Sequence, residues 1–277
     1  MAHYLAAGHD VHVLTCTLGE EGEVVPPELA HLDSAHEDAL GTLRREELRE
    51  AMRRLGAQHA VLGEDAAAGV ASRYRDSGMD GMPSNGHPDA FSRADPDEAA
   101  TLVARHIRSL DPDVVVTYDE HGGYGHPDHV QAHRVTTRAL ARIAASGQGH
   151  GGPRFAYQIL TPRSWAEQDR IWLCDNVPRS SVLTLPGTAD PLPPSVVADE
   201  RVSHAVVDAS VLTAVSTALA AHRTQVRVFE GHYALSNGVA ARLSPRQGYV
   251  RVDPATGGAI RTGPVSRHTG LLGETRA

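Results

Sequence analysis

The side chains best suited to chemistry stand together in the segment GGYGHPDH, residues 122–129. A neutral imidazole is a common zinc ligand. A second imidazole, held by a carboxylate such as Asp128, can act as an acid or stabilise an oxyanion. The phenol of Tyr124 can donate to the same oxyanion. The segment therefore predicts a metal ligand, a proton donor and an oxyanion donor in one place; a glycine-rich turn with solvated histidines is the alternative interpretation.

The flanking sequence indicates how this segment is positioned. Residues 113–118 (DVVVTY) form a continuous apolar run, which is typical of a buried strand in a parallel sheet. Ligands of open α/β sheets bind beyond the carboxyl ends of such strands. Pro127 suits the first turn of a helix expected to continue over residues 130–145, which places His129 near its N-terminus. His126 and His129 are three residues apart and should face the same side.

The remaining elements alternate between strand and helix. This order predicts an α/β fold with a mostly parallel sheet, a missing first strand and a smaller mixed C-terminal part. We assign residues 1–150 to the α/β core, 151–255 to the C-terminal part of the same domain and 256–277 to a mobile tail. The predicted strands are 10–17, 59–62, 113–118, 155–160 and 202–207, and the predicted helices are 2–8, 36–55, 96–110, 130–145 and 209–221.

Composition excludes several classes of function. The 277 residues carry a net charge of −8, without the basic excess of a nucleic-acid-binding protein. No run of about 18 apolar residues is present, and the N-terminus has no signal-peptide pattern, so we expect a cytoplasmic protein without a membrane partner. The sequence has no lysine, which excludes lysine nucleophiles, and Cys16 and Cys174 are too far apart for a Cys-x-x-Cys zinc site.

Several segments, in the same order, resemble the PIG-L/LmbE-like deacetylase family and, within it, the deacetylases of mycothiol biosynthesis. The resemblance implies a Rossmann-like fold, one zinc ion and a small-molecule glycoside substrate. The implied reaction removes the N-acetyl group of N-acetylglucosaminyl-inositol. The matching segments are HVLTCTLGEEGEV (12–24), YRDSGM (74–79), ADP (94–96), VVVTYD (114–119), HPDHVQAHRVTT (126–137) and HYALSN (232–237).

The resemblance also implies roles for single residues in segment 122–129. His129 would be a zinc ligand, and His126 would stabilise the oxyanion or protonate the leaving amine. Asp128 would hold His126, and Tyr124 would assist at the tetrahedral intermediate.

Three further residues would bind the substrate by the same resemblance. Glu23 would face the sugar, whereas Arg44 and Asp76 would contact sugar or inositol hydroxyl groups. A solvated surface charge is the alternative for Glu23 and for Arg44, since charged residues are common on such a helix.

The sequence departs from the family at its first signature. The family's His-Pro-Asp-Asp segment supplies two zinc ligands and the general base, and it precedes the helix that here ends at Gly8. The printed sequence does not contain it, and His87-Pro88-Asp89 is followed by Ala90. A catalytic zinc typically needs three protein ligands, so we expect an incomplete zinc site and little activity in these 277 residues.

A start codon assigned too late is the expected explanation. Two alternatives stay open: an inactive truncated paralogue that binds a sugar or a partner, and the amidase that cleaves mycothiol S-conjugates. The native metal, zinc or ferrous iron, and the oligomeric state also stay open.

Overall fold

The computed structural model describes residues 1–146, 152–178, 181–260 and 268–273. The chain forms two compact units, each assembled from separate segments. Unit 1 comprises residues 1–78, 165–191 and 208–245, and unit 2 comprises residues 79–164, 192–207 and 246–277. The predicted domain boundaries at residues 150 and 255 remain predictions, and most of the predicted tail, 261–267 and 274–277, lies outside the described residues.

Unit 1 contains a small parallel sheet and the helices beside it. β1 (His12–Thr15) pairs in parallel with β2 (Gln58–Val61), and α1 (Ala2–Ala6) and a 3-10 helix (Pro27–Leu32) lie on either side of β1 in the chain. α2 (Leu40–Leu55) packs against α7 (Leu212–Leu219). Ala51, Met52 and Ala221 are buried in the core between them.

A second part of unit 1 is an antiparallel three-stranded sheet. Its strands are β7 (Arg227–Val228), β8 (His232–Ala234) and β9 (Ala240–Arg242). Most of α6 (Arg163–Asn176) belongs to the same unit, and Leu173 on this helix shares a buried core with Ala234 and Ala240.

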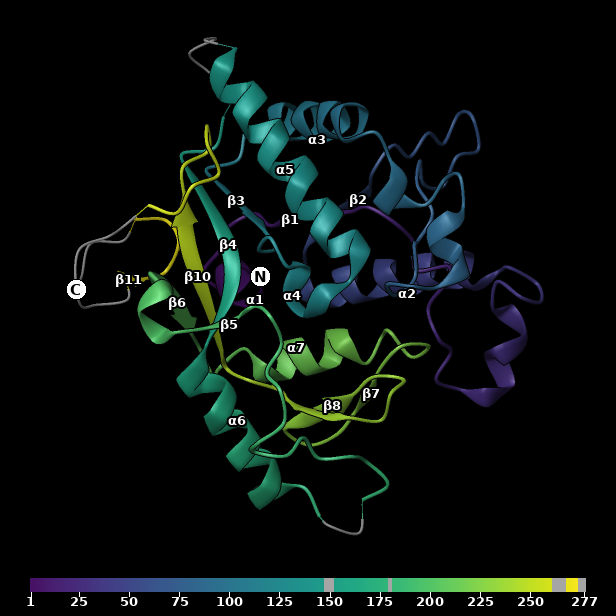
Figure 1. Cartoon of the computed structure of the whole chain (residues 1–277), viewed down its shortest axis with the longest axis vertical. Coiled ribbons are helices and arrows are strands. Elements are labelled where there is room, and N and C mark those ends of the chain that lie inside the picture. Colours follow the sequence, from purple (N-terminus) through teal and green to yellow (C-terminus); the bar gives the residue numbers. More distant parts are fainter. Residues whose placement is uncertain (147–151, 179–180, 261–267, 274–277) are drawn as a thin grey trace. The chain divides into compact units, whose positions relative to one another are not determined.

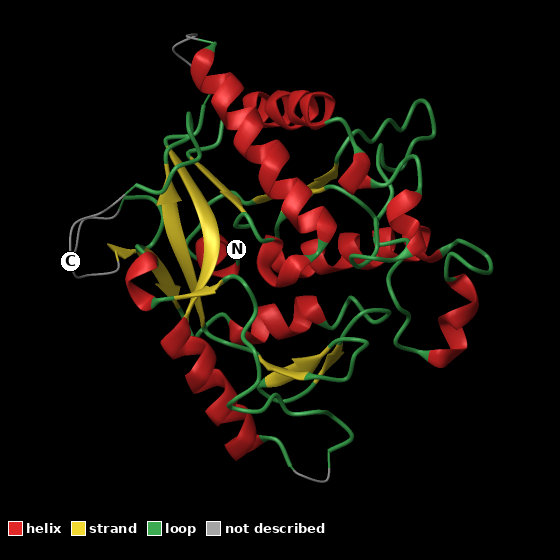
Figure 2. Cartoon of the chain, in the orientation of Figure 1, coloured by secondary structure: helices red, strands yellow, loops and turns green. Residues whose placement is uncertain are grey.

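Unit 2 is built on a mixed sheet, whose two longest strands lie side by side in Figure 2. The strand order is β11-β6-β10-β4-β3, and β5 also pairs with β4. The β3–β4 pair is parallel, whereas β10 is antiparallel to both β4 and β6. The strands are β3 (Val114–Thr117), β4 (Phe155–Pro162), β5 (Val196–Val197), β6 (His204–Val207), β10 (Arg246–Val252) and β11 (His268–Thr269).

Two long helices of unit 2, α3 (Pro96–Leu110) and α5 (Pro127–Ala145), pack against each other (Figure 1). α3 begins where the Asp95 side chain accepts hydrogen bonds from the backbone N–H groups of Asp97 and Glu98. α5 begins in the same way, with the His126 side chain as its cap and Pro127 in its first turn. The short helix α4 (Gly122–Gly125) precedes it, and two 3-10 turns (Pro83–Gly86 and Phe91–Arg93) precede α3.

The predicted α/β class is confirmed, and several details differ. The helix predicted over 36–55 begins only at Leu40, because residues 33–39 form tight turns in which Asp38 has a φ of 50°. The parallel pairs β1–β2 and β3–β4 lie in separate sheets among the described residues. α6 was not predicted, since Leu173 and Arg170 are its only buried residues and give no clear apolar stripe. In the described parts of the chain, no helix combines the length and apolar character needed to cross a membrane.

Candidate active site

The segment that follows β3 folds into a tight turn, residues 119–129, within unit 2. The side-chain oxygen Oδ1 of buried Asp119 accepts the backbone N–H of Gly123 at 2.9 Å. The carbonyl oxygen of Asp119 accepts the N–H of Gly122 at 3.0 Å. Gly122 has a φ of 62°, and a Cβ added there would lie 2.6 Å from the backbone nitrogen of Val130. The 119–129 turn therefore requires glycine at position 122.

His129 is oriented by this turn. Its Nδ1 lies 3.1 Å from the carbonyl oxygen of Gly122. Because a carbonyl oxygen can only accept, Nδ1 must carry the proton, and Nε2 of the neutral ring keeps its lone pair. The ring is also stacked on Tyr118, with centroids 4.1 Å apart and planes 7° apart. His129 thus has the tautomer that a metal ligand binding through Nε2 requires.

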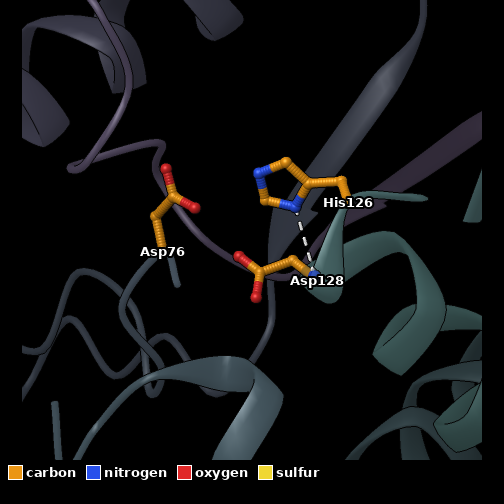
Figure 3. Close-up of side chains that lie close together, drawn as sticks. All are labelled: Asp76, His126 and Asp128. Carbon is orange, nitrogen blue, oxygen red and sulfur yellow. Dashed lines mark hydrogen bonds between the residues drawn. The ribbon is translucent and has the colours of Figure 1, made fainter. Parts of the chain in front are cut away.

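His126 has the opposite tautomer. Its Nδ1 accepts the backbone N–H of Asp128 at 3.2 Å (Figure 3). Nδ1 is therefore unprotonated, and a neutral ring carries its proton on Nε2. The ring centroids of His126 and His129 are 4.9 Å apart. His126 can therefore donate a proton from its Nε2, while His129 offers a lone pair from its own Nε2.

Asp128 and Tyr124 complete the turn. Asp128 is buried, and its carboxylate and His126 offer possible ligand atoms within 4.8 Å of each other. The Tyr124 side chain is half exposed, and its ring centroid is 5.2 Å from that of His129 and 6.2 Å from that of His126. Figure 3 also labels Asp76, which belongs to unit 1 and is described below with that unit.

The turn suits a metal ion by the chemistry of its donors. Imidazole nitrogen and carboxylate oxygen are ligands of zinc and of ferrous iron. The tautomer of His129 fits this use, since its second ring nitrogen is held by a backbone carbonyl as metal-ligating histidines usually are. The described residues therefore include groups that could bind a metal ion.

The three predicted substrate-binding residues, Glu23, Arg44 and Asp76, belong to unit 1. The Glu23 side chain is exposed, and its carbonyl oxygen accepts Nη2 of Arg44 at 2.9 Å. Arg44 is buried, and its Nη1 donates to the carbonyl oxygen of Gly19. Burial lowers the pKa of Arg44, while the negative charges of nearby carboxylates act in the opposite direction. Arg44 is therefore a buried cation and not the solvated charge that the alternative interpretation expected.

Asp76 is also buried within unit 1. Its Oδ1 accepts the backbone N–H of Gly78 at 3.0 Å, and its own N–H donates to Oε2 of Glu20 at 3.0 Å. Burial raises the pKa of Glu20, whereas the hydrogen bond from the Asp76 backbone lowers it. Asp76 and the loop that contains Glu20 and Glu23 are thus joined by a hydrogen bond.

The structure brings the four residues predicted in unit 2 into one turn and joins Glu23 directly to Arg44 in unit 1. Sequence reasoning missed three buried polar residues that support them: Asp119, Glu47 and Thr224. Asp119 directly follows an apolar strand, and Glu47 is three residues after Arg44 on one helix, so both had a local signal. Thr224 had none, because its partners on α2 are about 180 residues away.

Comparisons with known proteins identify the family of the chain. The family model described as GlcNAc-PI de-N-acetylase (PIG-L) matches residues 1–140. A protein of Thermomonospora curvata named 1D-myo-inositol 2-acetamido-2-deoxy-alpha-D-glucopyranoside deacetylase is 44% identical, over 98% of this chain and 89% of its own length. A protein of the same name from Thermobifida fusca is 44% identical over 88% of this chain and 82% of its own length. The crystal structure of the zinc-inhibited form of teicoplanin deacetylase matches with 18% identity and a TM-score of 0.46, over 91% of each chain. The family match and the sequence identities show that this chain belongs to the PIG-L family of de-N-acetylases.

Proposed function

We propose that the protein hydrolyses the N-acetyl group of N-acetylglucosaminyl-inositol, a step of mycothiol biosynthesis, in the cytoplasm. Relatives that are 41–44% identical carry the name of this deacetylase. The residues that the resemblance singles out lie in the 119–129 turn, beside buried Asp119, and in unit 1, where Glu47 and Thr224 are buried. The substrate is then a small-molecule glycoside.

The opposite tautomers of His126 and His129 are the observation that carries this proposal. Hydrolysis of an amide needs a lone pair that can hold an electrophile and a donor that serves the oxyanion or the leaving amine. The Gly122 carbonyl fixes the first arrangement at His129, and the Asp128 N–H fixes the second at His126. Two fully solvated histidines would not be held in complementary states by these backbone groups.

The other residues take roles consistent with this division. Tyr124, half exposed beside both imidazoles, donates its hydroxyl to the oxyanion. Asp128 orients His126 through its backbone N–H. A zinc ion held with the help of His129 supplies, when bound, the Lewis acid that makes water a nucleophile near neutral pH. Glu23, Arg44 and Asp76 bind the sugar and inositol hydroxyl groups.

A pair of variants of the protein tests the two roles separately. We expect His129→Ala to lose bound zinc and activity together. His126→Ala should keep its zinc and lose turnover by about 10²–10⁴-fold, the usual contribution of a general acid or base. Metal content by mass spectrometry and amine release from N-acetylglucosaminyl-inositol are the two measurements, and exposed His121→Ala is the matched control from the same segment.

Two outcomes would contradict the proposal. Equal loss of zinc in both variants would show that the tautomers do not divide the roles. Faster hydrolysis of a mycothiol S-conjugate than of N-acetylglucosaminyl-inositol would identify the amidase instead.

A further inference from the structure

Unit 1 contains a buried polar cluster formed by Arg44, Glu47 and Thr224. These side chains are 7%, 5% and 0% exposed, although two of them belong to charged residue types. Arg44 and Glu47 lie one turn apart on α2, and Thr224 follows α7 in the chain. Removing two charges from water costs several kcal/mol per ion unless their hydrogen bonds are satisfied. We therefore expect these buried hydrogen bonds to hold a structural element in place.

Each polar atom of Thr224 takes part in a hydrogen bond, and the bond of its carbonyl oxygen joins the cluster to the neighbouring loop. Its backbone N–H and its hydroxyl donate to the two carboxylate oxygens of Glu47, at 2.9 and 2.7 Å. The same hydroxyl oxygen accepts Nε of Arg44 at 3.3 Å. The carbonyl oxygen of Thr224 accepts the backbone N–H of Val25 at 2.9 Å. Glu47 thus fixes Thr224, and Thr224 fixes one end of the loop formed by residues 19–25.

The other side of the Arg44 guanidinium holds the same loop. Nη1 donates to the carbonyl of Gly19 and Nη2 to the carbonyl of Glu23. The loop is wrapped closely around this group, because a Cβ at Gly22 would lie 2.0 Å from Nη1 of Arg44. The cluster thus holds loop 19–25 at Gly19, Glu23 and Val25, while the Glu23 side chain is exposed. Glu20 and Glu21 of the same loop are held separately, by Asp76 and Arg75.

We propose that Glu47 is a positioning residue, which acts through Thr224 and Arg44 to hold loop 19–25 in the conformation that presents Glu23 to the substrate sugar. The proposal rests on the function proposed above, since it takes Glu23 as a sugar-binding residue. Glu47 itself touches no substrate. Its carboxylate accepts two hydrogen bonds from Thr224 and lies 4.0 Å from Nε of Arg223. Together with Asp76 and Glu20 it also places negative charge near the buried guanidinium of Arg44.

Glu47→Gln is the direct test, and Glu46→Gln is its control, because Glu46 is an exposed carboxylate on the same helix. We expect Glu47→Gln to accelerate amide hydrogen exchange at Val25 and Thr224 by about tenfold or more, with little change in β2. The same substitution should raise KM for N-acetylglucosaminyl-inositol by about tenfold and leave kcat within about twofold. Glu46→Gln should change neither quantity.

A second pair of variants keeps the proposal testable if Glu47→Gln folds poorly. Thr224→Ser keeps the hydroxyl group and should match the wild type in both measurements. Thr224→Val keeps the shape, loses the hydroxyl and should reproduce Glu47→Gln. Equal behaviour of the serine and valine variants would overturn the proposal.

The two readouts separate this proposal from the proposed function. Uniformly faster exchange throughout unit 1 would overturn the positioning role, because Glu47 would then contribute only to stability. Local loosening of loop 19–25 without a change in KM would also overturn it. If no variant and no wild-type protein deacetylates the substrate, the proposed function fails, while the exchange data still decide whether Glu47 holds the loop.

Discussion

Loop 19–25 in unit 1 and the 119–129 turn in unit 2 carry predicted site residues, but they are held in different ways. The turn is held by its own neighbours: Asp119 bonds Gly122 and Gly123, and Gly122 bonds His129, all within seven residues. The loop is held by the Arg44 side chain on α2 and by the backbone carbonyl oxygen of Thr224 after α7, two residues that are 180 positions apart in the chain. The hydrogen bonds of the turn are therefore mainly local, with one long-range bond from the N–H of Ser195 to the carbonyl oxygen of Gly123, whereas the loop depends on the tertiary structure of unit 1.

The largest effect should come from removing the central charge that holds the loop. Arg44→Met keeps much of the side-chain volume, but it leaves the carbonyls of Gly19 and Glu23 without their donor and removes a buried positive charge near Glu47. We expect the free energy of unfolding in urea to fall by about 3–5 kcal/mol. Arg45→Met is the control, because Arg45 pairs with Glu64 near the surface and should cost at most about 1 kcal/mol.

Similar losses in Arg44→Met and Arg45→Met would remove the contrast between the two regions. Loop 19–25 would then be held by its own backbone, as the 119–129 turn is.

A smaller effect is expected from a substitution that disturbs the turn. Gly122→Ala places a Cβ 2.6 Å from the backbone nitrogen of Val130, which cannot move without shifting the start of α5. Gly81→Ala is the control, since Gly81 also has a positive φ, of 83°, but has no atom near its added Cβ. The control should lose about 1–2 kcal/mol for its backbone conformation. Gly122→Ala should lose about 1–3 kcal/mol more from the collision.

Urea unfolding of the two glycine variants provides the measurement. If Gly81→Ala loses as much stability as Gly122→Ala, the close approach to Val130 contributes nothing, and a positive φ alone explains the glycine at position 122.

The difference between the regions also explains what the sequence could predict. Segment 122–129 revealed its turn, its helix start at Pro127 and its paired histidines, because all of these depend on neighbours in the chain. For Arg44, on the helix predicted over 36–55, a solvated surface charge was the alternative interpretation. The buried face of this helix in fact includes Arg44 and Glu47. No local pattern could show this, since the polar partner that makes their burial possible is Thr224.

The same reason limits the prediction of the sheets. The strands β1 to β4 were visible as short apolar runs, but the antiparallel pairing of β10 with β4 and β6 joins segments about 40 to 90 residues apart. α6 escaped prediction because its buried face is nearly without apolar residues. Local signals therefore predicted the elements of the α/β fold and one of the two polar regions, and long-range contacts determined the rest.

The smallest effect concerns Glu20, a carboxylate of loop 19–25 whose pKa is raised. Burial raises the pKa of Glu20 above its ordinary value of 4.5, so the folded protein binds this proton more tightly than the unfolded chain does. The contribution of Glu20 to stability is therefore fully present below pH 4.5 and is lost as the pH rises through the raised pKa. Glu20→Gln keeps an oxygen that can accept the Asp76 N–H and does not titrate.

Urea unfolding between pH 4 and pH 7 compares the two proteins. The free energy of unfolding of the wild type, relative to that of Glu20→Gln, should decrease across this interval. Exposed Glu50 behaves in the opposite way, because hydrogen bonds from Arg53 and Arg54 lower its pKa to about 2, and the Glu50→Gln variant serves as the control. A Glu20→Gln profile parallel to that of the wild type would show that Glu20 is solvated in the folded protein. Loop 19–25 would then depend still more on Arg44 and Thr224, which would sharpen its contrast with the mainly local turn of unit 2.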